Sequence, residues 1–283
     1  MSGDLDDRGG RHRCRRLGRV RSGDRPGRGD RSEAYRVRAP CRPRRRRPHT
    51  LAANMDVVAV VHGLRPRFNP RRMERELVLA HQSGATALVV LTKTDLVPAE
   101  ETRRAVSEAR AAAPGVEVID VSNRTGAGID HLSRVLAPGL TFALLGASGV
   151  GKSSLVNRIA GRHVVLEGTT RAGDDKGRHT TTSARLIVLD GGRLVLDTPG
   201  VRALALWEAW EGLAATFAEI DRAEQGCRFA DCLHESEPHC AVRDAVDQGR
   251  IDPARLASWH RLREEMDQLD TRLEDRRRRT ADR

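Results

Sequence analysis

The segment Gly146 to Ser153, with the sequence GASGVGKS, constrains the fold of this chain more than any other feature. It fits the pattern GxxxxGK[ST], in which glycines let the backbone wrap closely around phosphate oxygens. Such a loop needs a strand before it and a helix that begins within it, because the first N–H groups of that helix point at the phosphate. Residues 141–145 predict the strand, and residues 152–159 predict the helix. We therefore expect a nucleotide-binding α/β domain.

Short apolar runs alternate with segments of helical periodicity from residue 56 to residue 197. A buried parallel strand reads as a continuous apolar run, and residues 56–61 (DVVAVV) are of this type. The alternation predicts a mostly parallel sheet with helices on both faces and one antiparallel hairpin. The expected strands are 56–61, 87–91, 116–121, 141–145, 184–190 and 193–197, and the expected helices are 70–83, 98–113, 129–136, 152–159, 207–225 and 253–275.

A guanine-type segment, TKTD (Thr92 to Asp95), precedes the phosphate loop instead of following it. In the pattern NKxD the acid accepts hydrogen bonds from both N–H groups of the guanine edge, whereas adenine would leave that buried carboxylate unpaired. A DTPG segment (Asp197 to Gly200) comes last. Ras-like GTPases carry these parts in the order phosphate loop, DxxG, NKxD. The rotated order predicts a circularly permuted P-loop GTPase, with an ATP-using P-loop enzyme as the alternative.

Each segment has an expected role around GTP and Mg²⁺. Lys152 is expected to bridge the β- and γ-oxygens as a catalytic residue, and Ser153 to hold Mg²⁺. Asp197 would reach Mg²⁺ through water, and the Gly200 amide would bind the γ-phosphate. A backbone N–H of residues 122–123 is expected to meet guanine O6. The predicted GTP-binding residues are Thr92, Lys93, Asp95, Ser122, Asn123, Gly146, Ala147, Ser148, Gly149, Val150, Gly151, Lys152, Ser153, Ser154, Asp197 and Gly200.

Val201 stands where Ras-like enzymes carry the glutamine that orients the attacking water. A valine cannot orient water, so either catalysis is intrinsically slow or another residue does this work. His179, in the segment GRHTTT, is our candidate catalytic residue, and contact with a partner is its alternative role. Thr180 or Thr181 is expected to complete the Mg²⁺ shell.

A second cluster, with the spacing Cys227-x4-Cys232-x-His234-x5-Cys240, follows the nucleotide motifs. Three thiolates and one imidazole complete a tetrahedral zinc site with no open position, so the predicted Zn²⁺ is structural. His239 is an alternative nitrogen ligand, although its adjacency to Cys240 would strain the geometry. Cys14 and Cys41 lie far from the cluster and are expected to take no part.

The formal net charge of +11 lies entirely in residues 1–50, which hold 17 Arg against 6 acidic residues. Residues 51–283 hold 33 basic and 33 acidic residues. Such a basic segment is typical of an RNA-binding arm or of a disordered, Arg-rich tail. The sequence contains neither a run of eighteen apolar residues nor a secretory signal, so we expect a cytoplasmic protein with no membrane partner.

The segments TKTDL, GASGVGKSSLVN, GRHTTT and DTPGVR and the cysteine–histidine cluster, in this order, resemble the RsgA/YjeQ family over roughly residues 51–275. The resemblance implies a bacterial GTPase that binds the small (30S) ribosomal subunit and its rRNA late in assembly and is stimulated by it. It also implies a part in hydrolysis for the switch histidine, which agrees with His179. The family usually begins with an rRNA-binding OB-fold. Residues 1–50 are too short for one, so it is expected to be truncated or absent, through replacement by a basic tail or an erroneous upstream reading frame.

Three parts are therefore expected: a basic segment over residues 1–50, a circularly permuted GTPase domain over 51–205, and a zinc-binding helical domain over 206–283. The expected function is that of a monomeric GTPase that hydrolyses GTP to GDP and phosphate during maturation of the small subunit, with hydrolysis driving release. The alternative is a zinc-module RNA-binding protein that uses the nucleotide only as a sensor.

Overall fold

The computed structural model describes residues 37–39, 49–52, 55–165, 185–197, 206 and 209–281. Every described residue belongs to one compact unit, Ser32–Arg283. His179, Thr180, Thr181 and Gly200 lie outside the described residues, as does the side chain of Asp197. In the part of the chain that the structure describes, no helix has the length and apolar character needed to span a membrane.

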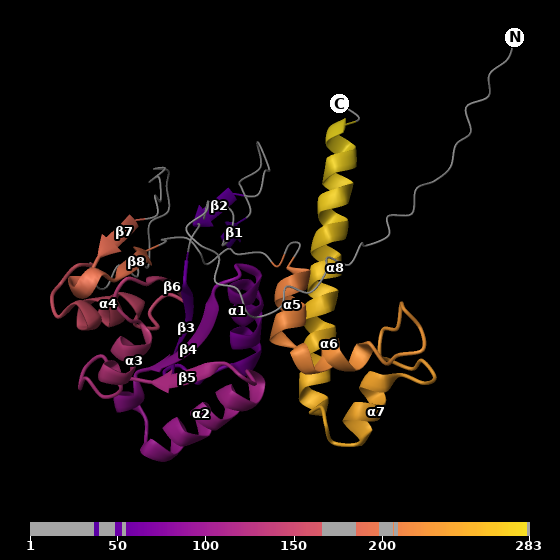
Figure 1. The fold of residues 1–283 in the computed structure, drawn as a ribbon, viewed down its shortest axis with the longest axis horizontal. Coiled ribbons are helices and arrows are strands. Elements are labelled where there is room, and N and C mark those ends of the chain that lie inside the picture. The colour runs from indigo at the N-terminus through magenta and orange to yellow at the C-terminus, as the bar shows by residue number, and fades with distance from the viewer. Residues whose placement is uncertain are drawn as a thin grey trace, which may run out of the picture. The chain divides into compact units, whose positions relative to one another are not determined.

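Within the described residues, six strands form one sheet in the order β5-β4-β3-β6-β8-β7 (Figure 1). Neighbouring strands are parallel except β7 and β8, which pair antiparallel as a hairpin. The predicted sheet, mostly parallel with one terminal hairpin, is confirmed. The strands are β3 (Val57–Gly63), β4 (Thr86–Thr92), β5 (Glu117–Asp120), β6 (Thr141–Leu145), β7 (Arg185–Val188) and β8 (Leu194–Asp197).

Helices cover both faces of this sheet, as the sequence predicts. Val58 and Val60 of β3 belong to one apolar cluster, together with side chains of α1 and α2. Val57 and Ala59 belong to the cluster on the other face, with side chains of α3 and α4. Successive strand residues point to opposite faces, so burial on both faces requires the continuous apolar run seen in β3. The helices are α1 (Pro70–Gln82), α2 (Ala99–Ala112), α3 (Ile129–Val135) and α4 (Lys152–Ala160).

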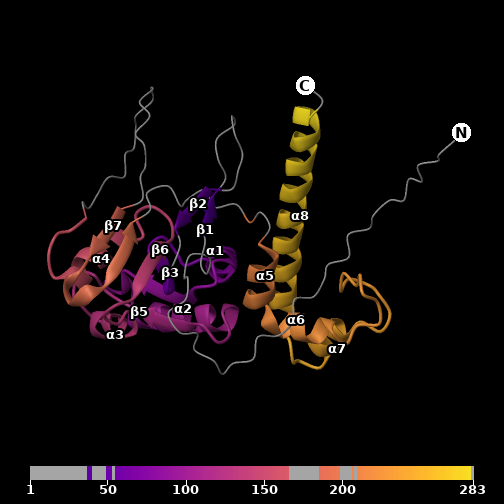
Figure 2. The same cartoon turned by 45° about the horizontal axis from the view of Figure 1, so that its top comes forward.

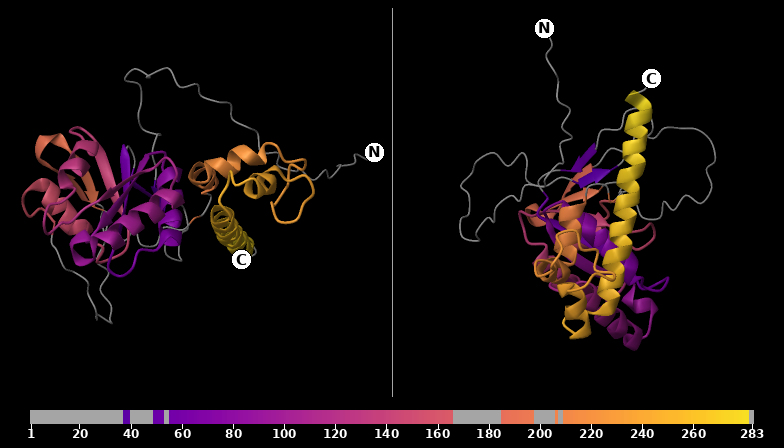
Figure 3. Two further views of the ribbon diagram at one scale, coloured as in Figure 1. Left: turned by 90° about the horizontal axis from the view of Figure 1, so that it is seen from below. Right: turned by 90° about the vertical axis from the view of Figure 1, so that its right-hand side faces the viewer.

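The C-terminal helices α5 (Trp210–Thr216), α6 (Ala218–Glu224), α7 (Ala241–Asp247) and α8 (Pro253–Ala281) share the apolar cluster that contains α1 and α2. The later turns of α8 run on past α5, while α6 and α7 lie beside its first turns (Figures 2 and 3). The sequence did not predict α7, and α8 continues six residues beyond the expected end at 275.

The prediction of a single helix over residues 207–225 is wrong, because the helix is interrupted at Phe217, between α5 and α6. In a continuous helix the Ile220 amide would donate to Thr216 O. Here it donates to Phe217 O at 2.9 Å, and the guanidinium of Arg255 occupies Thr216 O at 2.6 Å. The break therefore depends on a side chain from a distant helix, which apolar periodicity does not reveal.

A short antiparallel ladder joins β1 (Val37–Ala39) to β2 (His49–Ala52). The sequence of residues 1–50 lacks the alternation of a half-buried strand, and the pattern predicted no element there. Backbone hydrogen bonds between two short strands need no such alternation, which is why the pattern did not reveal them.

Candidate functional site

The predicted nucleotide-binding segments lie at the ends of three parallel strands of the sheet, β4, β5 and β6. β3 lies between β4 and β6, so the strand order reverses there. In an open α/β sheet, ligands bind at such a reversal, beyond the carboxyl ends of the strands. The TKTD segment begins with the last residue of β4 and enters the short helix η1 (Thr94–Leu96). Residues 122–127 follow β5, and the phosphate loop follows β6. The topology thus brings all three segments to one edge of the sheet.

The phosphate loop uses its glycines where no other residue fits. Gly146 has φ 140°, and a Cβ atom there would lie 2.2 Å from the backbone oxygen of Val61 in β3. Gly151 has φ 100° and immediately precedes α4. The Lys152 ammonium donates to the carbonyl oxygens of Gly146 at 2.9 Å and Ala147 at 2.6 Å. It therefore lies over the loop, where phosphate oxygens can replace these two carbonyls as acceptors.

A threonine and an asparagine tie the guanine-type segments to the phosphate loop. The fully buried hydroxyl of Thr92 donates to Val150 O at 2.5 Å, and His62 O lies 3.2 Å from the same oxygen. Asn123 Nδ2 donates to Gly151 O at 3.0 Å. These contacts cross 58 and 28 positions of sequence. Hydrogen bonds therefore connect the TKTD segment and the loop after β5 to the phosphate loop, although these segments are distant in the sequence.

The carboxylate of Asp95 is held by two side chains of the loop after β5. Ser122 Oγ donates to Oδ1 at 2.6 Å, and Arg124 Nε donates to Oδ2 at 2.8 Å. The Ser122 hydrogen bond, followed by that of Arg124, lowers the pKa of Asp95 below its usual value. Asp95 is therefore ionised and oriented. Sequence reasoning missed Arg124, although its place two residues after Ser122 is a signal that could have found it.

The loop after β3 is a further part of the site that the sequence did not suggest. Lys93 has φ 63°, a left-handed conformation, and its Nζ donates to Arg65 O at 3.1 Å. The Leu64 amide donates to Thr92 O at 3.0 Å, which binds the same loop to the end of β4. This loop therefore supports the side chain of Lys93, one of the predicted GTP-binding residues.

Asn157 of α4 anchors the chain just before the undescribed residues 166–184. Its Oδ1 accepts from the amides of Val164 and Val165 at 2.8 Å each, and its Nδ2 donates to Val165 O at 2.8 Å. The residue is 7% exposed. Because these bonds fix the chain leaving α4, Asn157 has a positioning role that motif spacing did not reveal.

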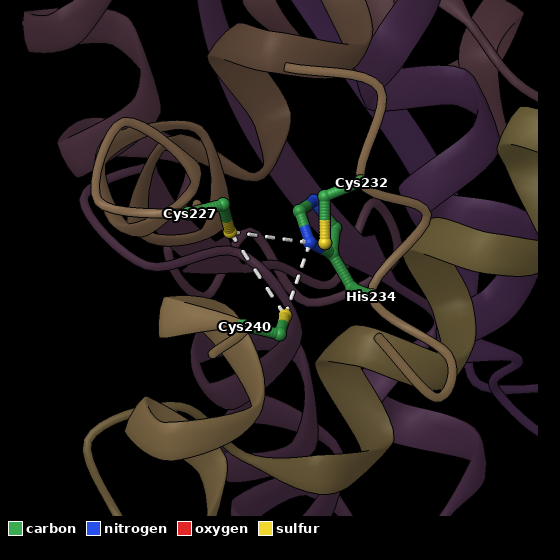
Figure 4. A group of neighbouring side chains, drawn as sticks. All are labelled: Cys227, Cys232, His234 and Cys240. Carbon is green, nitrogen blue, oxygen red and sulfur yellow. Dashed lines mark hydrogen bonds between the residues drawn. The ribbon is translucent and has the colours of Figure 1, made fainter. Parts of the chain in front are cut away.

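The four predicted metal ligands converge in the C-terminal region (Figure 4). Their ligand atoms all lie within 4.8 Å of one another. The Sγ atoms of Cys227 and Cys240 are 3.9 Å apart, and His234 Nδ1 lies 3.7 Å and 3.4 Å from them. Tetrahedral zinc with Zn–S of about 2.3 Å would place two sulfurs about 3.8 Å apart. The cluster Cys227, Cys232, His234 and Cys240 therefore fits a zinc ion, and its members in the described residues do not include His239.

Two side chains lie beside the histidine of this cluster. Glu224 Oε2 lies 3.7 Å from His234 Nε2, the ring nitrogen that faces away from the sulfurs. The indole of Trp259 packs on the same ring, with centroids 5.2 Å apart. A carboxylate near the second nitrogen of a ligating histidine is a common way to select which nitrogen binds metal. Neither residue was evident from the spacing of the ligands.

Glu237 organises the loop between His234 and Cys240. Its carboxylate accepts backbone N–H groups from Leu233 at 2.7 Å, Glu235 at 2.9 Å and Ser236 at 3.0 Å. These bonds, that of Leu233 foremost, lower the pKa of Glu237 to about 2. The ionised carboxylate therefore acts as a cap for three backbone amides on either side of His234.

Replacing Glu237 with glutamine is expected to lower the melting temperature by about 2–4 °C near neutral pH. The folded pKa lies below the usual 4.5, so the stabilisation is present above pH 4.5 and is lost as pH falls through about 2. The difference between wild type and variant should therefore close over that acidic interval, as thermal melts would show. Glu235→Gln, an exposed change in the same loop, is the control, and a gap independent of pH would contradict the assignment.

Comparison with known proteins places these features in a family. Residues 35–207 match the model of the RsgA GTPase family. Two relatives named small ribosomal subunit biogenesis GTPase RsgA come from Syntrophotalea carbinolica (46% identical over 220 residues, 77% of this chain and 60% of the relative) and Streptomyces avermitilis (44% over 227 residues, 80% and 61%). The chain thus spans about three fifths of the length of these relatives.

Two solved structures share the fold. YjeQ from Thermotoga maritima has a TM-score of 0.60 at 28% identity, over 82% of this chain and 76% of its own. YloQ, described as a circularly permuted GTPase, has a TM-score of 0.57 at 26% identity, over 85% and 73%. Together with the observed strand order, these similarities confirm the predicted circularly permuted P-loop fold.

Proposed function

We propose a function from the premise that this chain belongs to the RsgA GTPase family: it binds GTP at the carboxyl edge of the sheet, hydrolyses it, and acts in late maturation of the small ribosomal subunit. The observation that carries the proposal is the bond from the buried Thr92 hydroxyl to Val150 O. It joins a base-recognition segment directly to a phosphate loop, as one nucleotide spanning both would require.

In this proposal the carboxylate of Asp95 accepts the N–H groups of guanine, and the stem of Lys93 covers the base. The backbone of residues 146–154 surrounds the phosphates. Lys152 leaves its two carbonyl acceptors for the β- and γ-oxygens and stabilises the charge that develops on them during transfer. The γ-phosphate is sensed by the Gly200 amide.

The oxygen ligands proposed for Mg²⁺ are of the hard type that this ion prefers: the hydroxyl of Ser153, that of Thr180 or Thr181, and Asp197 through water. When bound with GTP, the ion neutralises phosphate charge. His179 is proposed to orient the attacking water, since Val201 cannot. The γ-phosphate state then sets the affinity for the subunit, and hydrolysis acts as the release step.

We propose that the cysteine–histidine cluster holds one structural zinc ion, because four ligands leave no position for a substrate. The proposed partner is the small subunit with its rRNA, bound by a monomer in the cytoplasm. The names of the relatives support the ribosomal partner. The order of the chain supports a link between nucleotide and partner, since the segments that sense the γ-phosphate lead directly into the C-terminal helices.

The test is single-turnover hydrolysis of GTP by wild type and His179→Ala, each with and without added 30S subunits. We expect slow hydrolysis alone, clear stimulation by subunits in the wild type, and loss of most of that stimulation in the variant, on the order of the 10²–10⁴-fold typical of acid–base and positioning groups. ATP serves as the control substrate. Tight subunit binding without stimulated turnover would instead favour a zinc-module RNA-binding protein that only senses nucleotide, and equal stimulation of both proteins would remove His179 from the mechanism.

A further inference from the structure

We propose that Arg124 is a positioning residue for guanine recognition, acting through the carboxylate of Asp95; this inference rests on the proposed GTP-binding function. The two side chains of the pair differ sharply in exposure: that of Arg124 is 74% exposed, and that of Asp95 is 9% exposed. The arginine thus reaches from the solvent side to an acid within the site. Its Nε lies 2.8 Å from Oδ2.

The two donors hold the carboxylate at both ends. Ser122 binds Oδ1 and Arg124 binds Oδ2, so neither oxygen can swing without breaking a hydrogen bond. The terminal torsion of an aspartate is otherwise broad. Each oxygen of an ionised carboxylate can accept a second hydrogen bond, so both remain able to receive a guanine N–H. With Arg124 removed, only the Ser122 hydrogen bond to Oδ1 would remain, and the carboxylate of Asp95 could rotate more freely.

The loop that carries Arg124 is itself tied down on both sides of the residue. Asn123, its predecessor, donates through Nδ2 to Gly151 O at 3.0 Å. The next two amides, of Thr125 and Gly126, donate to Ser122 Oγ at 3.1 Å and Ser122 O at 2.9 Å. Because the backbone is held in place, the guanidinium loses less conformational entropy when it binds Asp95. The phosphate loop and the base-recognition carboxylate are thereby linked through one short segment.

The first measurement is GDP affinity by calorimetric titration of wild type, Arg124→Ala and Arg124→Lys. We expect the alanine variant to bind GDP about two- to fivefold more weakly, the range for an exposed ion pair, and the lysine variant to recover part of the loss. Arg104→Ala is the matched control, because Arg104 Nε pairs with Glu108 at the same 2.8 Å and its side chain is 66% exposed. That variant should bind GDP as the wild type does. Unchanged or tighter GDP binding by Arg124→Ala would overturn the proposal, since tighter binding means that Arg124 competes with guanine.

The second measurement separates positioning of Asp95 from a general attraction for phosphate. Asp95→Asn should weaken GDP binding and favour xanthosine diphosphate, and adding Arg124→Ala to it should not weaken xanthosine diphosphate binding further. An equal loss in both backgrounds would show that Arg124 acts on the phosphates or on folding, and would sink the inference. If Asp95→Asn left GDP binding unchanged, the guanine pocket itself would be wrong, which is a distinct result.

Discussion

Replacing Cys240 with serine is expected to abolish stoichiometric zinc binding and to unfold the loop over residues 227–240. A serine hydroxyl does not replace a thiolate, so we expect metal affinity to fall by more than about 100-fold, the upper range seen for loss of second-shell partners. The loop has little apolar burial of its own: Phe229 and Leu233 are 40% and 42% exposed. Structural zinc contributes about 10–16 kcal/mol in small zinc-binding peptides. We therefore expect the metal to supply most of the free energy that keeps the loop over residues 227–240 folded.

Metal analysis of the purified protein and hydrogen exchange of its amides would check this prediction. We expect one zinc per chain in the wild type and in Cys41→Ser, the thiol control. Amides of residues 227–240 should exchange faster in Cys240→Ser, while those of the buried strand β3 keep their protection. Retention of zinc by Cys240→Ser, or a loop that stays protected after chelation, would contradict the assignment.

Replacing Arg255 with methionine is expected to lower the free energy of unfolding by about 3–5 kcal/mol, the cost of removing one partner from a buried ion pair. Arg255 is 5% exposed, and its hydrogen bonds join α8 to four other helices, α1, α2, α5 and α6. Its guanidinium binds Glu219 at 2.7 Å, Glu74 at 3.2 Å, and the carbonyls of Ala112 at 2.7 Å and Thr216 at 2.6 Å. It also stacks 4.1 Å above the ring of Phe217.

The size of this effect follows from what remains after the substitution. The Glu74 side chain is 4% exposed, and its other partner, Arg261, lies 3.4 Å away. Chemical denaturation measures the change, and Arg104→Met, on the exposed face of α2, should shift stability by less than about 0.5 kcal/mol. Adding Glu74→Met to Arg255→Met should restore part of the loss, because it removes a buried carboxylate that has only its longer contact with Arg261 left. A loss below about 1 kcal/mol in Arg255→Met would show that the network contributes little.

Most of the α/β layer was predictable because its signals are local. A run such as residues 57–61 must be apolar throughout to be buried on both faces, and GASGVGKS must contain its glycines to follow a backbone with positive φ. The helix break at Phe217 could not be predicted in the same way. The carbonyl oxygen of Thr216, which would accept a hydrogen bond in a continuous helix, accepts one from Arg255 instead. Arg255 lies 39 positions away, and apolar spacing gives no sign of such a contact.

In the candidate site, too, some residues were predictable from the sequence and others were not. The motifs predicted Thr92, Asp95, Lys152 and the cysteine–histidine ligands, because binding a base, a phosphate or a metal ion requires particular residue types at particular spacings. The sequence by itself thus determined the parallel α/β fold, the permuted order of its parts and the chemistry available to it. Only the tertiary structure decided which side chain holds the carboxylate of Asp95, that of Arg124, and which residues bind α8 to the sheet layer. Periodicity and motifs record what each residue does for its own element, whereas hydrogen bonds between distant elements form only when the fold brings donor and acceptor together.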